Sequence, residues 1–108
     1  MKLIKAIIRP EKVLPVLEAL SEKGHNSVTR ISVLGRGKQR GLKVGDVYYD
    51  EIPKEMLLIV VEDASVKETV QTIAGSARTE EAGAFGDGKI FVSEVSTAYT
   101  VSTGEEGL

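Results

Sequence analysis

One order of local patterns, repeated twice, restricts the possible fold of this chain more than any other feature. A strand-like pattern is followed by apolar residues at helical spacing and by a second strand-like pattern, and the same order recurs after a glycine-rich segment. The expected strands cover residues 3–8, 27–34, 56–61 and 89–95. This order predicts an α+β, ferredoxin-like βαβ–βαβ sandwich, in which four antiparallel strands have both helices on one face.

Two apolar stripes at helical spacing predict the two helices. The first consists of Val13, Val16, Leu17 and Leu20, and the second of Val66, Val70, Ile73 and Ala74. Pro15 requires the first helix to begin near residue 11 or 12, because a missing N–H is tolerated only in the first turn. Gly24 is a suitable residue to end that helix. Ser65 and Glu68 have the spacing of a capping box, which predicts the start of the second helix.

The third expected strand, residues 56–61, is a run of six apolar residues. Such a run is typical of a strand that is buried on both faces. Because two helices cover only one face of the sheet, the other face needs a further cover. Self-association is the simplest way to provide it.

Composition excludes several functional classes. The 108 residues fit one domain, residues 1–108, and 14 basic against 16 acidic residues give a net charge of -2 that disfavours a nucleic-acid partner. There is no cysteine and one histidine, His25, so disulfides and thiolate metal sites are excluded and a Ser/His/Asp triad is implausible. Since no apolar stretch approaches membrane-spanning length, we expect a cytoplasmic protein without membrane insertion.

The segment between the two halves is rich in glycine and positive charge. It opens with Gly35-Arg36-Gly37-Lys38-Gln39-Arg40-Gly41. Glycines allow the backbone to approach a ligand, the cations suit phosphate or carboxylate, and Gln39 offers a neutral oxygen to a hard cation. A flexible basic loop without a ligand is an equally good interpretation. Tyr48 and Tyr49 either contact a partner or pack back on the loop.

A second glycine-containing loop, residues 79–89, ends in Gly86-Asp87-Gly88-Lys89 directly before the last strand. Successive backbone N–H groups there could form an anion-binding nest, with Lys89 as a point charge. The motif is not a Walker A loop, because GxxxxGK[ST] is absent. Taken alone, it is more often a tight turn before a strand.

In combination, these motifs resemble the PII family of nitrogen-signalling proteins over essentially the whole chain. The resemblance rests on Ile7-Ile8-Arg9-Pro10, Thr29, Gly35-Arg36-Gly37-Lys38-Gln39-Arg40-Gly41, Pro53-Lys54, Ala77-Arg78-Thr79, Gly86-Asp87-Gly88-Lys89-Ile90-Phe91-Val92 and Thr103-Gly104-Glu105. Their order and matching spacing are far more specific than either glycine loop alone.

The resemblance implies a trimeric transducer of nitrogen status, not an enzyme, with ligand clefts between neighbouring subunits. Each cleft would bind ATP or ADP, with AMP as a further candidate, and 2-oxoglutarate beside it through Mg²⁺. By position, the nucleotide-binding residues would be Thr29, Gly37, Lys38, Val60, Gly86, Asp87, Gly88 and Lys89. The 2-oxoglutarate site would comprise Gln39, Gly41 and Lys54, with Gln39 also as the magnesium ligand.

The long loop, residues 36–53, corresponds to the family's T-loop, which changes shape with the ligand and docks on target proteins. Its partner contacts would be Arg40, Lys43, Asp46, Tyr48 and Tyr49. The short sequence from Val44 to Lys54 looks like the nitrogenase-associated subgroup, in which two different PII-like proteins act together and inhibit dinitrogenase when fixed nitrogen is plentiful. We therefore expect a homotrimer or a mixed oligomer with a paralogous PII subunit, and dinitrogenase as the target.

Three departures separate the chain from common bacterial members. The T-loop is shorter, so no tyrosine aligns securely with the uridylylated one, and the loop before Gly86 is longer. The two arginines that usually contact phosphates before the C-terminal tail, residues 96–108, are replaced by Thr100 and Ser102. The alternatives are regulation of an ammonium transporter or of glutamine synthesis, a PII-like scaffold without nucleotide sensing, and a small enzyme acting on a phosphate ester or anhydride. The chain lacks an evident nucleophile–base pair for the last of these.

Overall fold

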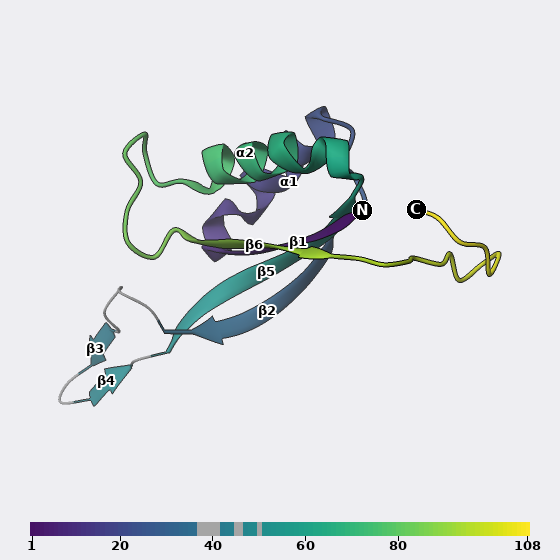
Figure 1. The fold of residues 1–108 in the computed structure, drawn as a ribbon. Coiled ribbons are helices and arrows are strands. Elements are labelled where there is room, and N and C mark those ends of the chain that lie inside the picture. The colour runs from purple at the N-terminus through teal and green to yellow at the C-terminus, as the bar shows by residue number, and fades with distance from the viewer. Residues whose placement is uncertain (37–41, 45–46, 50) are drawn as a thin grey trace.

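The computed structural model describes residues 1–36, 42–44, 47–49 and 51–108. The elements are β1 (Lys2–Ile8), the 3-10 turn η1 (Pro10–Lys12), α1 (Val13–Glu22), β2 (Thr29–Gly35), β3 (Leu42–Val44), β4 (Val47–Tyr49), β5 (Ile52–Val61), the 3-10 turn η2 (Asp63–Ser65), α2 (Val66–Ala77) and β6 (Gly88–Glu94). Four strands form an antiparallel sheet in the order β2-β5-β1-β6, and both helices lie on one of its faces (Figure 1). The predicted ferredoxin-like βαββαβ fold is confirmed.

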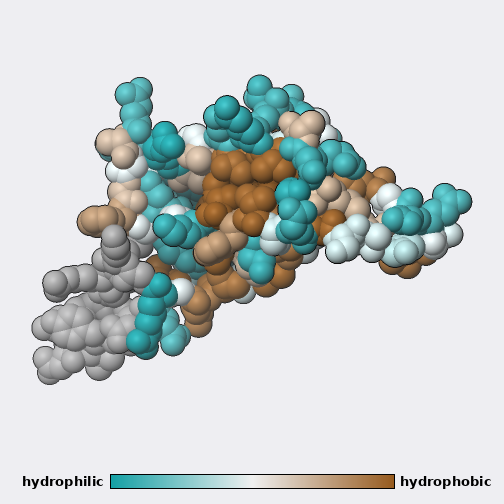
Figure 2. Space-filling view, viewed as in Figure 1, coloured by the Kyte–Doolittle hydropathy of each residue, from teal (hydrophilic) through white to brown (hydrophobic). Residues whose placement is uncertain are grey.

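The core lies between the helices and the covered face of the sheet. Every second residue of β1 and of the inner part of β5 is buried there, which is the pattern of strands with one covered face. The buried apolar side chains are Ile4, Ala6, Ile8, Val13, Val16, Leu20, Leu57, Ile59, Val61, Ile73 and Ala77. Figure 2 shows further apolar surface as a band between α2 and β6, where the sheet ends.

The first helix ends as its sequence predicts, and α1 begins at Val13, one or two residues later than predicted, after the 3-10 turn η1. Because η1 precedes α1, Pro15 lies in the first turn of the α-helix, where its missing N–H breaks no helical bond. Gly24 has a φ of 86°, and the His25 N–H returns to the Leu20 carbonyl at 2.9 Å, which closes the helix end. Within the residues that the structure describes, neither helix has the length and apolarity needed to cross a membrane.

The predicted capping box at the start of α2 is wrong. Ser65 ends η2 and has helical dihedral angles, and its side chain makes no capping hydrogen bond. Its carbonyl instead accepts the Thr69 hydroxyl at 2.7 Å. Because the 3-10 turn η2 precedes α2, the helical backbone already begins before Ser65. The spacing of Ser65 and Glu68 does not show this.

The third strand of the sheet and the T-loop also differ from the sequence prediction. β5 begins at Ile52 instead of residue 56 and has one buried face, while its other face is half-buried in the single chain. Within the T-loop, β3 and β4 pair as a short antiparallel hairpin, where the pattern predicted only loop. Strands of three residues are too short for alternation to be recognised in the sequence.

The uncovered face of the sheet is largely apolar. Cross-strand partners share a face, so the register assigns to it Leu3, Ile7, Ile31, Val33, Met56, Leu58, Val60 and Phe91. Ile31 and Phe91 are 41% and 51% exposed, which is unusual for large apolar side chains on a sheet. This open face is the surface that self-association is expected to cover.

A charge at the centre of the open face should prevent that self-association. Leu58 pairs with Lys5 of β1 on one side and with Thr29 of β2 on the other. Leu58→Glu would add a carboxylate beside Lys5 on a face that an assembly covers. Burial of this charge costs more than a pair with Lys5 returns, so we expect light scattering to show a monomer with intact helical circular dichroism. The matched control, Leu14→Glu, alters an exposed residue of α1 and should leave the mass of the assembly unchanged. An unchanged mass for Leu58→Glu would show that this face is not the interface.

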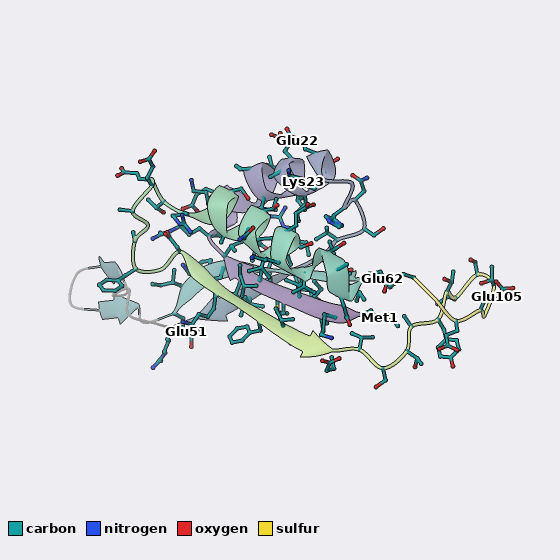
Figure 3. All side chains as sticks on the ribbon, turned by 45° about the horizontal axis from the view of Figure 1, so that its top comes forward. Met1, Glu22, Lys23, Glu51, Glu62 and Glu105 are labelled. Carbon is teal, nitrogen blue, oxygen red and sulfur yellow. The ribbon has the colours of Figure 1, made fainter. Side chains whose placement is uncertain are left out.

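The tail after β6 leaves the body of its own chain. It extends away from the sheet on the side opposite the β3–β4 hairpin (Figure 1), and Figure 3 shows Glu105 in the tail far from Glu51 at the base of the T-loop. The tail folds on itself, since the Thr100 N–H donates to the Glu105 carbonyl at 2.9 Å and the Gly107 N–H to the Ala98 carbonyl at 2.8 Å. Hydrogen bonds within the tail therefore define its local geometry.

Candidate ligand-binding cleft

A cleft of about 560 Å³ opens where the base of the T-loop meets the loop of residues 79–89, which we call the ligand loop. Its lining residues are Ile7, Gly35, Arg36, Ile52, Lys54, Ala84, Phe85, Gly86, Asp87, Gly88, Lys89 and Phe91. Gly35 and Ile52 face each other across the β2–β5 ladder, and this pairing forms the base of the T-loop. Residues of both glycine-rich segments thus line one cleft, together with the cationic side chains of Arg36, Lys54 and Lys89.

The Asp87 carboxylate organises the ligand loop. It accepts the Thr79 N–H at 3.1 Å, the Thr79 hydroxyl at 2.6 Å and the Ala84 N–H at 2.8 Å. Burial opposes ionisation of Asp87, but the hydrogen bonds from Thr79, Ala84 and Arg9 outweigh it and hold the pKa of this carboxyl far below its ordinary value. Asp87 is therefore an anion that holds the start of the loop, at Thr79, and its middle, at Ala84.

Arg9, directly after β1, connects the ligand loop to the sheet. Its Nε donates to Asp87 Oδ1 at 3.1 Å and its Nη2 to the Phe85 carbonyl at 2.8 Å. The ion pair is largely shielded, because the Arg9 and Asp87 side chains are 19% and 20% exposed. Since Arg9 contacts both the carboxylate and the backbone of the loop, it orients residues 85–87 relative to the cleft.

Lys54 reaches the cleft from β5. Its ammonium group donates to the Gly86 carbonyl, which joins the base of the T-loop to the ligand loop. Burial, followed by the positive charge of Arg9, lowers the pKa of Lys54. An anion beside Lys54 would relieve both effects, so this position favours a carboxylate or a phosphate.

Gly88 is required by the close approach of β6 to β1. Its φ is 123°, and a Cβ at this position would overlap the carbonyl oxygen of Ile7. Only glycine fits, so the ligand loop can enter β6 directly beside Ile7, which lines the cleft.

Five of the residues predicted from the sequence meet in this cleft: Lys54, Gly86, Asp87, Gly88 and Lys89. Thr29 and Val60 do not. They lie on the same face of the sheet as Lys54 but farther along the strands, where Thr29 pairs with Leu58 and Val60 with Leu3. Lys54 and Val60 are six residues apart on one strand, or about 20 Å. Within a single chain, Thr29 and Val60 are therefore too far away to share a ligand with the five residues of the cleft.

The remaining predicted residues belong to the T-loop. Gly37, Lys38, Gln39, Arg40, Gly41 and Asp46 lie outside the described residues. Lys43 of β3 pairs with Tyr48 of β4, and Tyr49 pairs with Leu42. The predicted ligand and partner contacts of these residues therefore stay predictions.

Sequence reasoning missed the roles of Arg9, Thr79 and Phe91. Arg9 and Thr79 belong to family motifs, but their common partner Asp87 is 78 residues from Arg9 and cannot be identified from spacing. Phe91 has the pattern of an ordinary strand residue, although the alternation of β6 places it beside Lys89 on the side of the cleft. The resemblance assigns Asp87 to phosphate, whereas its carboxylate bonds the loop itself.

Comparison with known proteins decides the family. The model of the family "Nitrogen regulatory protein P-II" matches residues 1–105. The chain belongs to the P-II family. Two similar proteins are both named nitrogen fixation nifHD region GlnB-like protein 1. The chain is 55% identical to that of Methanothermobacter marburgensis and 52% identical to that of Methanothermococcus thermolithotrophicus, over the full length of both chains each time.

A further relative carries the general family name. The nitrogen regulatory protein P-II 2 of Methanothermobacter thermautotrophicus is 44% identical over 99% of this chain and 94% of its own. The higher identity to the nitrogen-fixation-region proteins places the chain with that subgroup of the P-II family, as its T-loop sequence predicted.

Proposed function

We propose that this P-II protein senses nitrogen status by binding an adenine nucleotide and 2-oxoglutarate in the cleft, and that it regulates a partner, dinitrogenase, through its T-loop. The observation that supports this most is the composition of the cleft, in which Arg36, Lys54 and Lys89 line a glycine-rich backbone. Such a site suits a polyanion, because cations and approachable backbone N–H groups are the usual ligands of phosphate. The names of the nitrogen-fixation-region relatives favour dinitrogenase over other targets.

The complete site would require a second copy of the chain or a paralogous P-II subunit. Thr29 and Val60 lie far from Lys54 on the open face, so a neighbour has to bring them to the cleft. The apolar open face supports association, and the tail projects beyond its own domain, where it can reach a neighbour. We propose a trimer, in keeping with the family, with each cleft between two subunits.

The described residues fit these ligands. Gly86 and Gly88 line the cleft and, without side chains, let its backbone come close to a phosphate, while Lys89 adds a charge and Ile7 and Phe91 provide an apolar surface. Magnesium, when bound, would screen the charge of the phosphates and would be coordinated by oxygens of 2-oxoglutarate. Lys54 would then exchange the neutral Gly86 carbonyl for a carboxylate, a stronger, charge-assisted partner. This exchange alters a contact between the ligand loop and the base of the T-loop, which gives the ligand a route to the T-loop.

Deletion of residues 42–51 tests regulation through the T-loop. The intact protein should inhibit dinitrogenase in the presence of ATP, and 2-oxoglutarate should relieve the inhibition. The shortened protein should bind nucleotide normally and fail to inhibit, because the deletion removes the β3–β4 hairpin and leaves the cleft residues in place. Full inhibition by the shortened protein would rule out T-loop docking, and absence of inhibition by the intact protein would rule out dinitrogenase as the target.

A further inference from the structure

We propose that Arg36 is a phosphate-binding residue of the cleft, that it contacts the terminal phosphate, and that it makes the cleft select nucleoside triphosphates and diphosphates over monophosphates. This inference rests on the proposed nucleotide-binding function and adds a determinant of specificity to it. Arg36 follows β2 directly and lines the cleft with Lys54 and Lys89.

The cleft is more positive than the charges of its lining residues alone suggest. Asp87 is the one carboxylate among the described lining residues, and its oxygens are bonded by Arg9, Thr79 and Ala84. Its negative charge is thereby compensated within the loop. The cations Arg36, Lys54 and Lys89 then dominate the field in the cleft, which favours an anion with several charges.

Residues 90–108 add no positive charge to the cleft. Residues 90–108 contain no lysine or arginine, whereas they contain Glu94, Glu105 and Glu106. A tail that approaches the cleft of a neighbouring copy therefore brings no cation. The positive charge that neutralises the phosphates therefore has to come from the cleft and from the T-loop, not from residues 90–108.

Among the three lining cations, Arg36 is best suited to a terminal phosphate. Lys54 is half-buried against the Gly86 carbonyl, and Lys89 emerges from the ligand loop beside the backbone that would hold the inner phosphates. Arg36 instead comes from the base of the T-loop and is exposed. A guanidinium is always charged and binds phosphate oxygens in pairs, which suits the most charged group of the ligand.

Calorimetric titration of the whole protein with ATP, ADP and AMP tests this assignment. Arg36→Gln should weaken ATP binding by about 10-fold or more and AMP binding by less than about 3-fold, as expected for the loss of one charged hydrogen-bonding partner of the outer phosphate. Arg36→Lys should restore part of the ATP affinity. The control Lys67→Gln removes one positive charge from the exposed face of α2. It should change neither the ATP affinity nor the AMP affinity.

The outcomes separate this inference from the proposed function. If the wild-type protein binds ATP and Arg36→Gln binds it equally well, the assignment of Arg36 is wrong and the nucleotide site stands. If Arg36→Gln lowered the affinities for ATP, ADP and AMP by the same factor, the assignment of Arg36 to the terminal phosphate would also be wrong. If the wild-type protein binds no nucleotide at all, both the proposed function and the role of Arg36 are wrong.

Discussion

Replacing Gly88 with alanine should destabilise the protein by about 3 kcal/mol or more and eliminate ligand binding. The new Cβ would overlap the Ile7 carbonyl oxygen, and the φ of 123° is unfavourable for any residue with a side chain. Relief of the overlap requires β6 to move away from β1, which opens the cleft floor between Ile7 and Lys89. Urea unfolding followed by circular dichroism measures the loss.

Gly75→Ala is the matched control for this prediction. Gly75 lies inside α2 and does not line the cleft, and a methyl group at this position would meet no atom within 4 Å beyond the backbone of its own helix. Alanine there should stabilise the protein by about 0.5–1 kcal/mol, because it lowers the entropy of the unfolded chain. A Gly88→Ala variant as stable as the wild type would contradict the observed approach of β6 to β1.

Asp87→Asn should have the second largest effect, a loss of about 2–3 kcal/mol near neutral pH. The amide keeps the shape of the side chain but removes the charge that Arg9, Thr79 and Ala84 bind. The ligand loop should then exchange its amide hydrogens faster, which hydrogen-exchange mass spectrometry can follow over residues 80–87. Glu81→Gln, in an exposed part of the same loop, is the control and should change neither quantity.

The effect of Asp87 should depend on pH in a defined direction. Its pKa is depressed in the folded protein, so the ionised form stabilises the fold at any pH above the unfolded pKa of ~4. This stabilisation is lost progressively as the pH falls below ~4 toward the folded pKa. The stability difference between wild type and Asp87→Asn should therefore be constant from neutral pH to about pH 5 and shrink on further acidification. A difference that does not shrink in acid would show that the Asp87 charge is not what holds the loop.

The sheet, the helices and five residues of the cleft could be predicted from the sequence because these depend on local patterns. Alternation in β1, the stripe from Val13 to Leu20 and the glycine at position 24 each report a local preference that the fold keeps. The family resemblance then identified the ligand loop, whose residues 84–89 line the cleft as a continuous segment.

What the sequence did not predict depends on contacts between distant residues. Arg9 and Asp87 are brought together by the pairing of β1 with β6, so neither residue alone reveals the role of the other. The β3–β4 hairpin is formed by two strands of three residues, too short for a periodic signal. The resemblance assigns Thr29 and Val60 to one site with Lys54, which a single chain cannot form, because these positions are separated along the sheet.

The central claim is that the cleft binds a nucleotide and, through it, 2-oxoglutarate. Calorimetric titration with 2-oxoglutarate, in the presence and absence of Mg²⁺ and ATP, tests it most directly. We expect 2-oxoglutarate to bind only when both Mg²⁺ and ATP are present. Lys54→Gln should abolish 2-oxoglutarate binding but weaken ATP binding only in part, because Arg36 and Lys89 still line the cleft. Absence of ATP binding, or 2-oxoglutarate binding that is independent of ATP and Lys54, would contradict the proposed sensor.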